Sequence, residues 1–204
     1  VEMQEHPELR GKSIAVCGDP EARHGIVLTA SYPAKRMGVK TGMPIWEAKQ
    51  HCRDLIIVPA SYGKYQKYSG YVREVFNDYT DQVESFGLDE AWLDITGSVG
   101  LFGSPVKIAK EISARIKREL GITVSIGVSF NKITAKLGSD YKKPDAITVI
   151  EPDTYKQIVY PLPVGDLLYV GNATQRKLGS YGIRTIGQLA ETNPEVLKGW
   201  FGVM

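Results

Sequence analysis

The chain has 204 residues, enough for one large domain or two to three small ones, and 43% of them are hydrophobic, as in ordinary globular proteins with a core. The formal net charge of +2 at pH 7 gives no general sign of a nucleic-acid or membrane partner. No run approaches the roughly 18 apolar residues of a membrane span and no signal-peptide pattern opens the chain, so we expect a cytoplasmic protein without a membrane partner. Cys17 and Cys52 have no zinc-finger spacing and are expected to be ordinary thiols.

The first part of the chain, up to about residue 60, is rich in glycine and proline and contains short apolar runs. Those at 14–16, 25–28 and 55–58 predict short strands beside short helices, that is, a small mixed α/β subdomain. Over 65–79, aromatic and aliphatic residues recur at helical spacing. This pattern predicts a helix whose aromatic stripe packs into a core.

Two adjacent carboxylates, Asp89 and Glu90, stand between two strand-like runs. Magnesium keeps near-octahedral oxygen geometry and commonly takes one or two carboxylates from the protein, while phosphates and water supply the other ligands. Neighbours in a strand point to opposite faces, so both acids reach one ion only where the backbone turns, and Gly87 permits such a turn. Most Asp-Glu pairs are merely solvated. The pair alone therefore leaves open both a magnesium site and a plain hairpin.

A second set of elements follows this hairpin. The spacing predicts a helix over 109–120 that Gly121 ends, an alternating strand over 122–129, a helix over 131–141 and a strand over 147–150. This order is typical of an α+β domain in which helices cover the apolar face of an antiparallel sheet. The other face of the sheet would be free for chemistry.

Positive charge is concentrated in the same region, between residues 107 and 143. The stretch has nine basic residues and three acids: Lys107, Lys110, Arg115, Lys117, Arg118, Lys132, Lys136, Lys142 and Lys143 against Glu111, Glu119 and Asp140. Either a solvated helix face or a phosphate-binding surface explains this pattern.

From residue 161 on, leucine and isoleucine mark short helices separated by glycines. The segment 170–178 followed by 182–187 has the outline of a helix-hairpin-helix, in which a glycine turn offers the amides of a helix N-terminus to a DNA phosphate. Gly171, Asn172 and Lys177 are the expected contacts with the DNA backbone. A small helical domain with ordinary caps remains the alternative.

Taken together, these segments resemble Y-family (translesion) DNA polymerases of the bacterial polymerase IV type. The resemblance is carried, in the order and spacing of that family, by residues 7–12, 30–44, 88–98, 125–132 and 135–144. It implies an α+β right-hand polymerase core. The implied parts are small α/β fingers over 1–60, a palm over 61–151 with an antiparallel, ferredoxin-like sheet backed by helices, and a helical thumb over 152–204.

The resemblance also assigns roles to residues. It implies that Asp89 and Glu90 are the catalytic residues and hold two Mg²⁺ ions, which activate the primer hydroxyl and neutralise the triphosphate. The contacts that it implies with the incoming dNTP are Thr29, Tyr32, Lys35, Arg36 and Lys143, and those with the nascent base pair are Ala30 and Gly42. The family usually has arginine and then lysine at positions 35 and 36, so this chain exchanges a bidentate fork for a point charge. Asp94 is expected to be structural.

Three departures from the family pattern qualify these roles. Family members begin with a strand that carries a third acidic ligand and an aromatic residue facing the ribose, and this chain starts after it. They end with a DNA-gripping little finger and usually a tail that binds the sliding clamp, which this chain does not reach. In the thumb, Tyr169 stands where the hairpin commonly has its first glycine. The resemblance therefore predicts a polymerase core that is inactive or impaired by itself.

The partners implied are primer-template DNA and dNTP, with a sliding clamp for the full-length protein and association with the nucleoid during repair. Two other functions stay open. One is a non-catalytic DNA-binding module that uses the basic stretch and the thumb hairpin. The other is a template-independent nucleotidyl cyclase on a palm-like sheet, which would leave the thumb segment unexplained.

Overall fold

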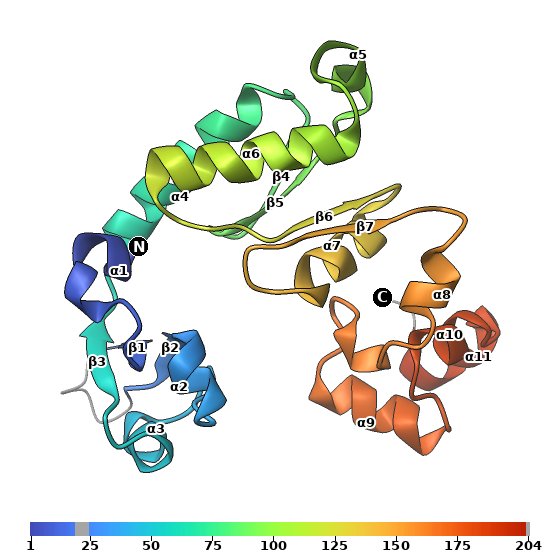
Figure 1. Cartoon of the computed structure of the whole chain (residues 1–204). Helices are drawn as coiled ribbons and strands as arrows, with labels where there is room; N and C mark the ends of the chain where they lie inside the picture. Colours follow the sequence, from blue (N-terminus) through green and yellow to red (C-terminus); the bar gives the residue numbers. More distant parts are fainter. Residues whose placement is uncertain (19–24, 203–204) are drawn as a thin grey trace. The chain divides into compact units, whose positions relative to one another are not determined.

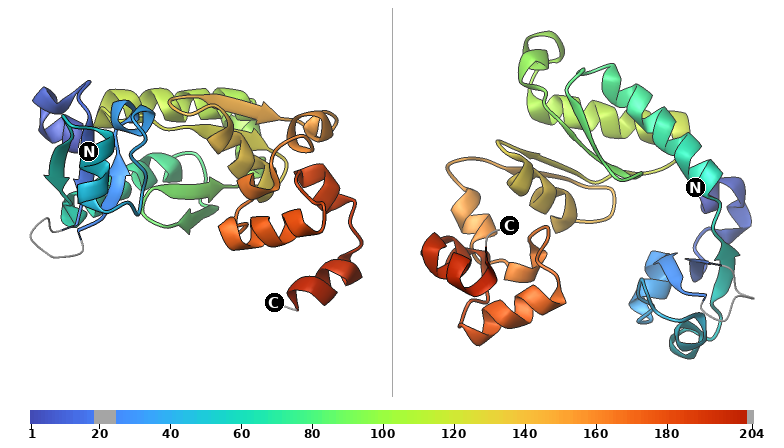
Figure 2. Two further views of the ribbon diagram at one scale, coloured as in Figure 1. Left: turned by 90° about the horizontal axis from the view of Figure 1, so that it is seen from below. Right: turned by 180° about the vertical axis from the view of Figure 1, so that it is seen from behind.

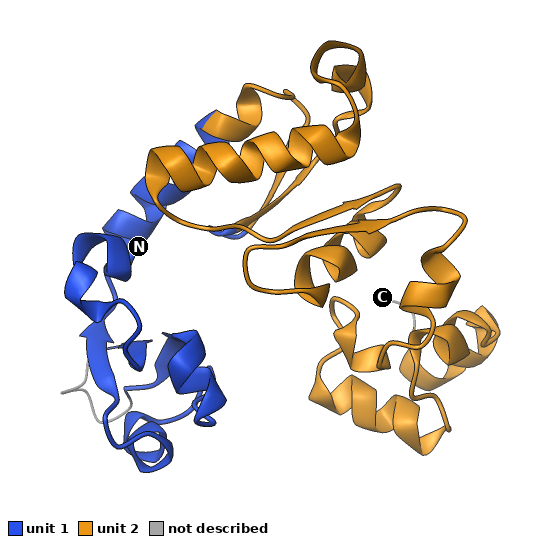
Figure 3. Cartoon of the chain, in the orientation of Figure 1, with its two compact units in different colours: residues 1–74, 87–89 blue, residues 75–86, 90–204 orange. Residues whose placement is uncertain are grey.

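The computed structural model describes residues 1–18 and 25–202. The chain forms two compact units, residues 1–74 with 87–89 and residues 75–86 with 90–204 (Figure 3). Within the described residues no helix is both long and apolar enough to cross a membrane. The three domain ranges expected from the sequence remain predictions, because the division into two compact units does not test them.

The first unit is built on a three-stranded sheet in the order β2-β1-β3. Central β1 (Ile14–Cys17) pairs antiparallel with β2 (Val27–Ala30) and parallel with β3 (Ile56–Pro59), and all four β1 residues are buried. The short helices of the unit are α1 (Glu2–Glu5), η1 (Pro7–Leu9), α2 (Tyr32–Arg36) and α3 (Ile45–His51). The predicted mixture of short strands and short helices is confirmed. Both cysteines are free and buried.

The predicted aromatic helix is α4 (Tyr62–Asn77). Its stripe is buried at the C-terminal end, where Val75 is 4% exposed and Tyr79, just beyond the helix, is 3% exposed. At the N-terminal end, the Tyr65 hydroxyl donates a 2.6 Å hydrogen bond to Oε1 of the buried Glu2. The stripe is therefore a core stripe at one end and a polar anchor for α1 at the other.

The second unit confirms the α+β class. After the hairpin of β4 (Val83–Phe86) and β5 (Glu90–Leu93) come η2 (Thr96–Ser98), α5 (Val99–Phe102), α6 (Pro105–Leu120), β6 (Ile126–Ser129), α7 (Lys132–Tyr141) and β7 (Ile147–Ile150). Gly121 ends α6 in the left-handed conformation, as predicted (φ 65°). The two strands β6 and β7 lie between α6 and α7 (Figures 1 and 2).

Two details of this region differ from the prediction. The β4-β5 pair is antiparallel, but β6 and β7 are parallel, because α7 returns the chain to the starting edge of the pair in a crossover connection. The strand expected over 122–129 begins only at Ile126. The reason is that β7 is four residues long and pairs only with Ile126–Ser129.

Helix α7 lies unusually close to β6 because the strand carries a glycine where the helix crosses it. A Cβ atom on Gly127 would lie 1.8 Å from the carbonyl oxygen of Ala135 and 2.6 Å from the amide nitrogen of Ser139. One on Gly138 would lie 3.1 Å from the Cα atom of Gly127. This backbone-to-backbone packing fixes the position of α7 on the strand pair.

The C-terminal part of the second unit is helical, as expected for the thumb. Its elements are α8 (Tyr155–Val159), η3 (Val164–Asp166), α9 (Asn172–Ser180), α10 (Ile186–Ala190) and α11 (Pro194–Phe201). Buried Val164, Leu178 and Ile183 form its core. The rings of Tyr181 and Trp200 stack with centroids 3.7 Å apart, which attaches α11 to the end of α9.

Candidate active site

The acidic pair lies in the tight turn of the β4-β5 hairpin. Phe86 pairs with Glu90, so residues 87–89 form a three-residue turn, and Gly87 adopts the left-handed backbone conformation (φ 72°) that the turn requires. The Arg73 guanidinium donates a 2.8 Å hydrogen bond to the Gly87 carbonyl oxygen. Asp89 is exposed in the turn and Glu90 is the first residue of β5. The turn predicted at Gly87 is thus confirmed.

An ammonium group already neutralises one of the two acids. Lys136 of α7 places its Nζ 2.8 Å from Oε1 of Glu90 and 2.9 Å from Oδ2 of Asp140, one turn further along the helix. The other oxygen of Asp140 lies 2.5 Å from Nζ of Lys143. A continuous row of alternating charges, Glu90, Lys136, Asp140 and Lys143, therefore extends from the hairpin along α7.

The surroundings of Lys136 and Asp140 shift the pKa values of these two side chains. Burial acts to lower the pKa of Lys136, but its two carboxylate partners outweigh burial and the pKa is raised. Burial acts to raise the pKa of Asp140, but Lys143 and Lys136 outweigh it and the pKa is lowered. Both shifts favour the charged forms of Lys136 and Asp140 at neutral pH.

A second ion pair ties α7 to the same hairpin. The Lys132 ammonium pairs with Glu84 of β4, and the Lys132 carbonyl oxygen accepts a 3.2 Å hydrogen bond from Nε1 of Trp92. This pair is open to solvent, with both side chains more than half exposed, whereas the side chain of Lys136 is 16% exposed. The two lysines thus join the same elements in different environments.

The residues expected to contact the nucleotide lie mostly in the first unit, at the junction of β2 and α2. Thr29 and Ala30 end β2, and Tyr32, Lys35 and Arg36 lie on α2. The Lys35 ammonium is 5.5 Å from the centroid of the half-exposed Tyr32 ring. Gly42 has φ 82° and donates its amide to the Val27 carbonyl oxygen (2.8 Å). Lys143 belongs to the second unit, on the charge row described above.

The predicted DNA-backbone contacts of the thumb are divided between the two ends of α9. Gly171 is the N-cap of the helix and Asn172 its first residue, both exposed. Lys177, near the other end, donates to the Trp200 carbonyl oxygen and lies 4.7 Å from the centroid of the Phe201 ring. Tyr169 has φ 69° and is 80% exposed. It occupies the left-handed conformation that glycine adopts without strain.

Comparison with known proteins shows the family of this chain. Residues 1–140 match the family described as "impB/mucB/samB family". The chain belongs to this family. Over 197 residues it is 56% identical to DNA polymerase IV of Acetivibrio thermocellus, covering 97% of this chain and 49% of that protein. It is 42% identical over 203 residues to DNA polymerase IV 1 of Bacillus subtilis, covering 100% and 49% of the two. The chain thus spans about half the length of these relatives.

Solved structures support the same family membership. DinB from Sulfolobus solfataricus superposes with a TM-score of 0.89 at 31% identity, covering 98% of this chain and 59% of that one. A structure described as the insertion ternary complex of Dbh DNA polymerase superposes with a TM-score of 0.90 at 32% identity, with the same coverage. The resemblance to Y-family polymerases inferred from the sequence is confirmed.

Sequence reasoning missed two members of the charge row in this impB/mucB/samB chain. Lys136 and Asp140 entered only as charges of the basic stretch, although their spacing of four residues, with Lys143 three further on, puts all three on one face of a helix. The link from Lys136 to Glu90 spans 46 residues of sequence, so no local pattern could have indicated it.

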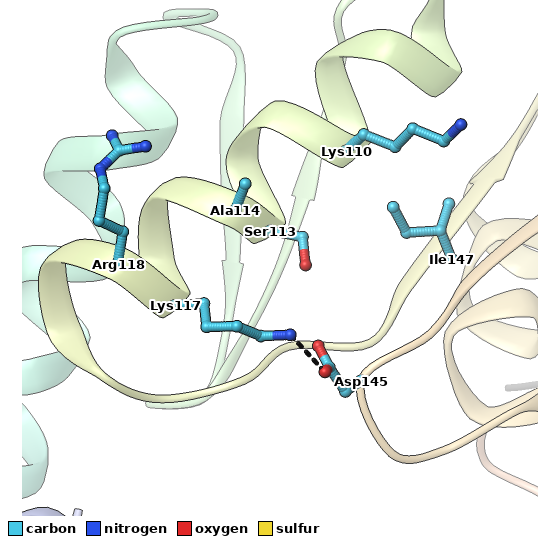
Figure 4. A pocket seen from close by; sticks show the side chains of 7 residues that line it. All are labelled: Lys110, Ser113, Ala114, Lys117, Arg118, Asp145 and Ile147. Atoms are coloured by element: carbon cyan, nitrogen blue, oxygen red, sulfur yellow. Dashed lines mark hydrogen bonds and ion pairs between the residues drawn. The ribbon is translucent and has the colours of Figure 1, made fainter.

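Helix α6 carries a separate cationic groove. Its volume is about 500 Å³, and it is lined by Lys110, Ser113, Ala114, Lys117, Arg118, Asp145 and Ile147 (Figure 4). Lys117 is paired with Asp145 at 2.5 Å. Ile147 faces this groove, whereas Gly127 of β6 faces α7. Successive side chains of β6 and β7 point to opposite faces of the strand pair. The basic residues between 107 and 143 are therefore divided between the face covered by α6 and the face covered by α7.

Among the described residues, no group of three or more His, Cys, Asp or Glu side chains is suited to hold a metal ion. Asp94, which follows β5, accepts a 2.9 Å hydrogen bond from the Thr96 amide through Oδ1. Hydrogen bonding from the Thr96 side chain, and then from the Thr96 amide, lowers the pKa of Asp94. The contact is local and agrees with the structural role expected for this acid.

Proposed function

We propose that this chain is the catalytic core of a translesion DNA polymerase, which adds a nucleotide from a dNTP to a primer end on a DNA template. The relatives named DNA polymerase IV and the match to a Dbh insertion ternary complex support this assignment. The observation that carries it is the charge row from Glu90 to Lys143. In this row ion pairs connect Glu90 of the hairpin with Lys143, the cation that we propose for the phosphates, and this supports the assignment.

The hairpin acids suit a magnesium site. Both offer hard carboxylate oxygens, and Glu90 already has a cation 2.8 Å from one of its oxygens, so the position beside it favours positive charge. We propose that Asp89 and Glu90 hold Mg²⁺, two ions in the active complex. Bound there, the metal would supply charge neutralisation and an activated primer hydroxyl.

The chain's own cations would bind the triphosphate. In this proposal Tyr32 and Lys35 hold phosphate oxygens from α2, with Thr29 and Arg36 beside them, and Lys143 contributes a second ammonium. Fixed cations lower the free energy of the negative charge that develops on the leaving pyrophosphate. The pairing of Lys143 with Asp140 restricts its ammonium before the nucleotide arrives.

Primer extension by the full-length protein on undamaged and abasic-site templates tests the proposal, because the core is expected to be inactive or impaired by itself. We expect Asp89→Ala and Glu90→Ala each to lower the extension rate by about 100-fold or more, since each removes a ligand from the charge-stabilising centre. Asp94→Ala removes a carboxylate close by in sequence that accepts a local hydrogen bond from Thr96, and we expect it to retain the rate. Equal extension by all four proteins would overturn the assignment.

Two further outcomes would identify the alternatives. DNA binding that is salt-dependent, without any extension, and indifferent to Asp89→Ala would indicate a DNA-binding module. Turnover of nucleotide in the absence of DNA would indicate a cyclase. Binding to a sliding clamp is proposed for the full-length protein and is tested by size-exclusion chromatography with the purified clamp.

A further inference from the structure

The strongest unassigned feature is the ammonium of Lys136, which bridges two carboxylates inside the proposed active site. Its side chain is 16% exposed and lies 2.8 Å from Glu90 and 2.9 Å from Asp140. A mainly buried charge is retained in a fold only when it is paired, because its desolvation is costly. Lys136 forms ion pairs with both acids at the same time. Without its positive charge, the two carboxylates would repel each other.

The backbone that carries Lys136 is fixed. Its neighbour Ala135 is the residue whose carbonyl oxygen would lie 1.8 Å from a Cβ on Gly127. The N-terminus of the helix is capped by Asn131, whose side chain accepts from the Thr134 amide at 2.9 Å. The ammonium therefore reaches Glu90 from a rigid support rather than from a mobile loop.

From this geometry we propose that Lys136 is a positioning residue that holds the cation position beside Glu90 until a divalent metal takes it. When the metal binds, the ion pair between Lys136 and Glu90 breaks and the pair between Lys136 and Asp140 remains. Asp140 continues to hold Lys143 in position for the triphosphate. This inference rests on the proposed function, since it takes Glu90 as a metal ligand. In the metal-free protein, Lys136 prevents repulsion between the carboxylates of Glu90 and Asp140.

The test compares Lys136→Met with Lys132→Met. Both changes remove one positive charge from α7 and one ion pair to the β4-β5 hairpin, but Lys132 pairs with the exposed Glu84. For each chain, Mn²⁺ binding is measured by electron paramagnetic resonance, and thermal unfolding is measured with and without Mn²⁺. Neither nucleotide nor DNA is added.

We expect Lys136→Met to bind Mn²⁺ about tenfold more tightly than the unaltered chain, because a competing charge is gone. At saturating Mn²⁺ the metal-induced rise in Tm should then be about 3 to 6 °C larger. Lys132→Met should match the unaltered chain in both. Equal Mn²⁺ responses in all three proteins would overturn the inference but leave the metal site intact. The absence of any Mn²⁺ response would overturn the metal site and this exchange together.

A measurement on the unaltered chain avoids any folding defect of the variant. Acetylation of lysines with acetic anhydride is followed by mass spectrometry with and without Mn²⁺. We expect the modification of Lys136 to rise at least threefold with Mn²⁺, while that of Lys132 stays constant. Unchanged modification of Lys136 at a Mn²⁺ concentration that saturates the resonance signal would contradict the exchange.

Discussion

At the scale of single residues, one buried hydroxyl attaches the proposed nucleotide-binding helix to its sheet. The Ser31 Oγ accepts hydrogen bonds from the amides of Ile14 (3.0 Å) and Ala34 (3.5 Å) and donates to the Lys12 carbonyl oxygen (3.0 Å). It thereby caps α2 and connects it to β1. The orientation of Tyr32 and Lys35 depends on this connection.

We therefore expect Ser31→Ala to destabilise the chain by about 1 to 3 kcal/mol, because it leaves a buried amide and a carbonyl oxygen without partners. Urea unfolding followed by circular dichroism measures the change. Ser98→Ala is the matched control, since Ser98 is the N-cap of α5 but makes no side-chain capping bond. Its effect should stay within about 0.5 kcal/mol. Equal losses in the two variants would contradict this account of Ser31.

The ion pairs of Asp140 predict that the free energy of unfolding depends on pH. The pKa of this carboxyl is lowered in the folded chain, mainly because Lys143 and Lys136 outweigh burial, so the folded value lies below the unfolded one. Its stabilising effect is complete above the unfolded pKa of about 3.9 and is lost as the pH falls through the lower, folded value. The side chain is 43% exposed, so we expect about 1 kcal/mol at most.

The measurement is the difference in unfolding free energy between the unaltered chain and Asp140→Asn. We expect a difference at pH 6 that shrinks steadily toward pH 3. A difference that stays constant over that range would show that the ion pairs of Asp140 contribute nothing to stability.

At the scale of elements, the hydrophobic periodicity of the sequence predicted the features that depend on residues close together in the chain. The apolar spacing predicted α6 and α7, and the glycine after α6 predicted its end. The same reasoning extended β6 too far, because the length of a strand depends on its partner, and β7 pairs with only four residues. It also missed the ion pair between Lys136 and Glu90, since tertiary packing of α7 on β6 brings them together.

This packing is tested by Gly127→Ala. The added methyl group would lie 1.8 Å from the Ala135 carbonyl oxygen, so α7 must move as a whole. We expect a loss of about 3 kcal/mol or more in unfolding free energy. Gly179→Ala in α9 is the control, because a Cβ there meets nothing within 4 Å, and a helical alanine should be neutral or stabilise by about 0.5 to 1 kcal/mol. A small effect at Gly127 would mean that α7 is not held by backbone contact.

The thumb hairpin offers the opposite case, a non-glycine residue where glycine is favoured. Tyr169 has φ 69° with an exposed side chain. We expect Tyr169→Gly to stabilise the chain by about 0.5 to 1 kcal/mol, the relief of left-handed strain less the entropy of glycine in the unfolded state. Differential scanning calorimetry measures this as a higher Tm. A lower Tm would indicate that the ring contributes packing that outweighs the strain.

At the scale of the whole molecule, the sequence indicated an excess of basic residues but not where they face. The strand pair separates them into two groups. One lies at the α6 groove, with Lys110 and Arg118 (Figure 4), and the other on the α7 side, with Lys142 at the end of α7 and Lys143 paired with Asp140 of that helix. Composition cannot make this distinction, because it depends on which face of β6 and β7 each helix covers. Our proposal for the function requires DNA to approach the side that carries Glu90 and α7.

This requirement gives a prediction with a charge-matched control. Lys142→Ala with Lys143→Ala, and Lys110→Ala with Arg118→Ala, each remove two positive charges from the chain. We expect the first pair to weaken binding to duplex DNA and to reduce the slope of log K against log salt by about 1, since Lys143 is assigned to the triphosphate, Lys142 is left for DNA, and each phosphate contact contributes about 0.9. The second pair should leave affinity and slope unchanged, because the α6 groove lies on the other side of the strands. Fluorescence anisotropy across a salt series decides between them. An equal loss of slope in both variants would mean that binding follows total charge and not one face of the molecule.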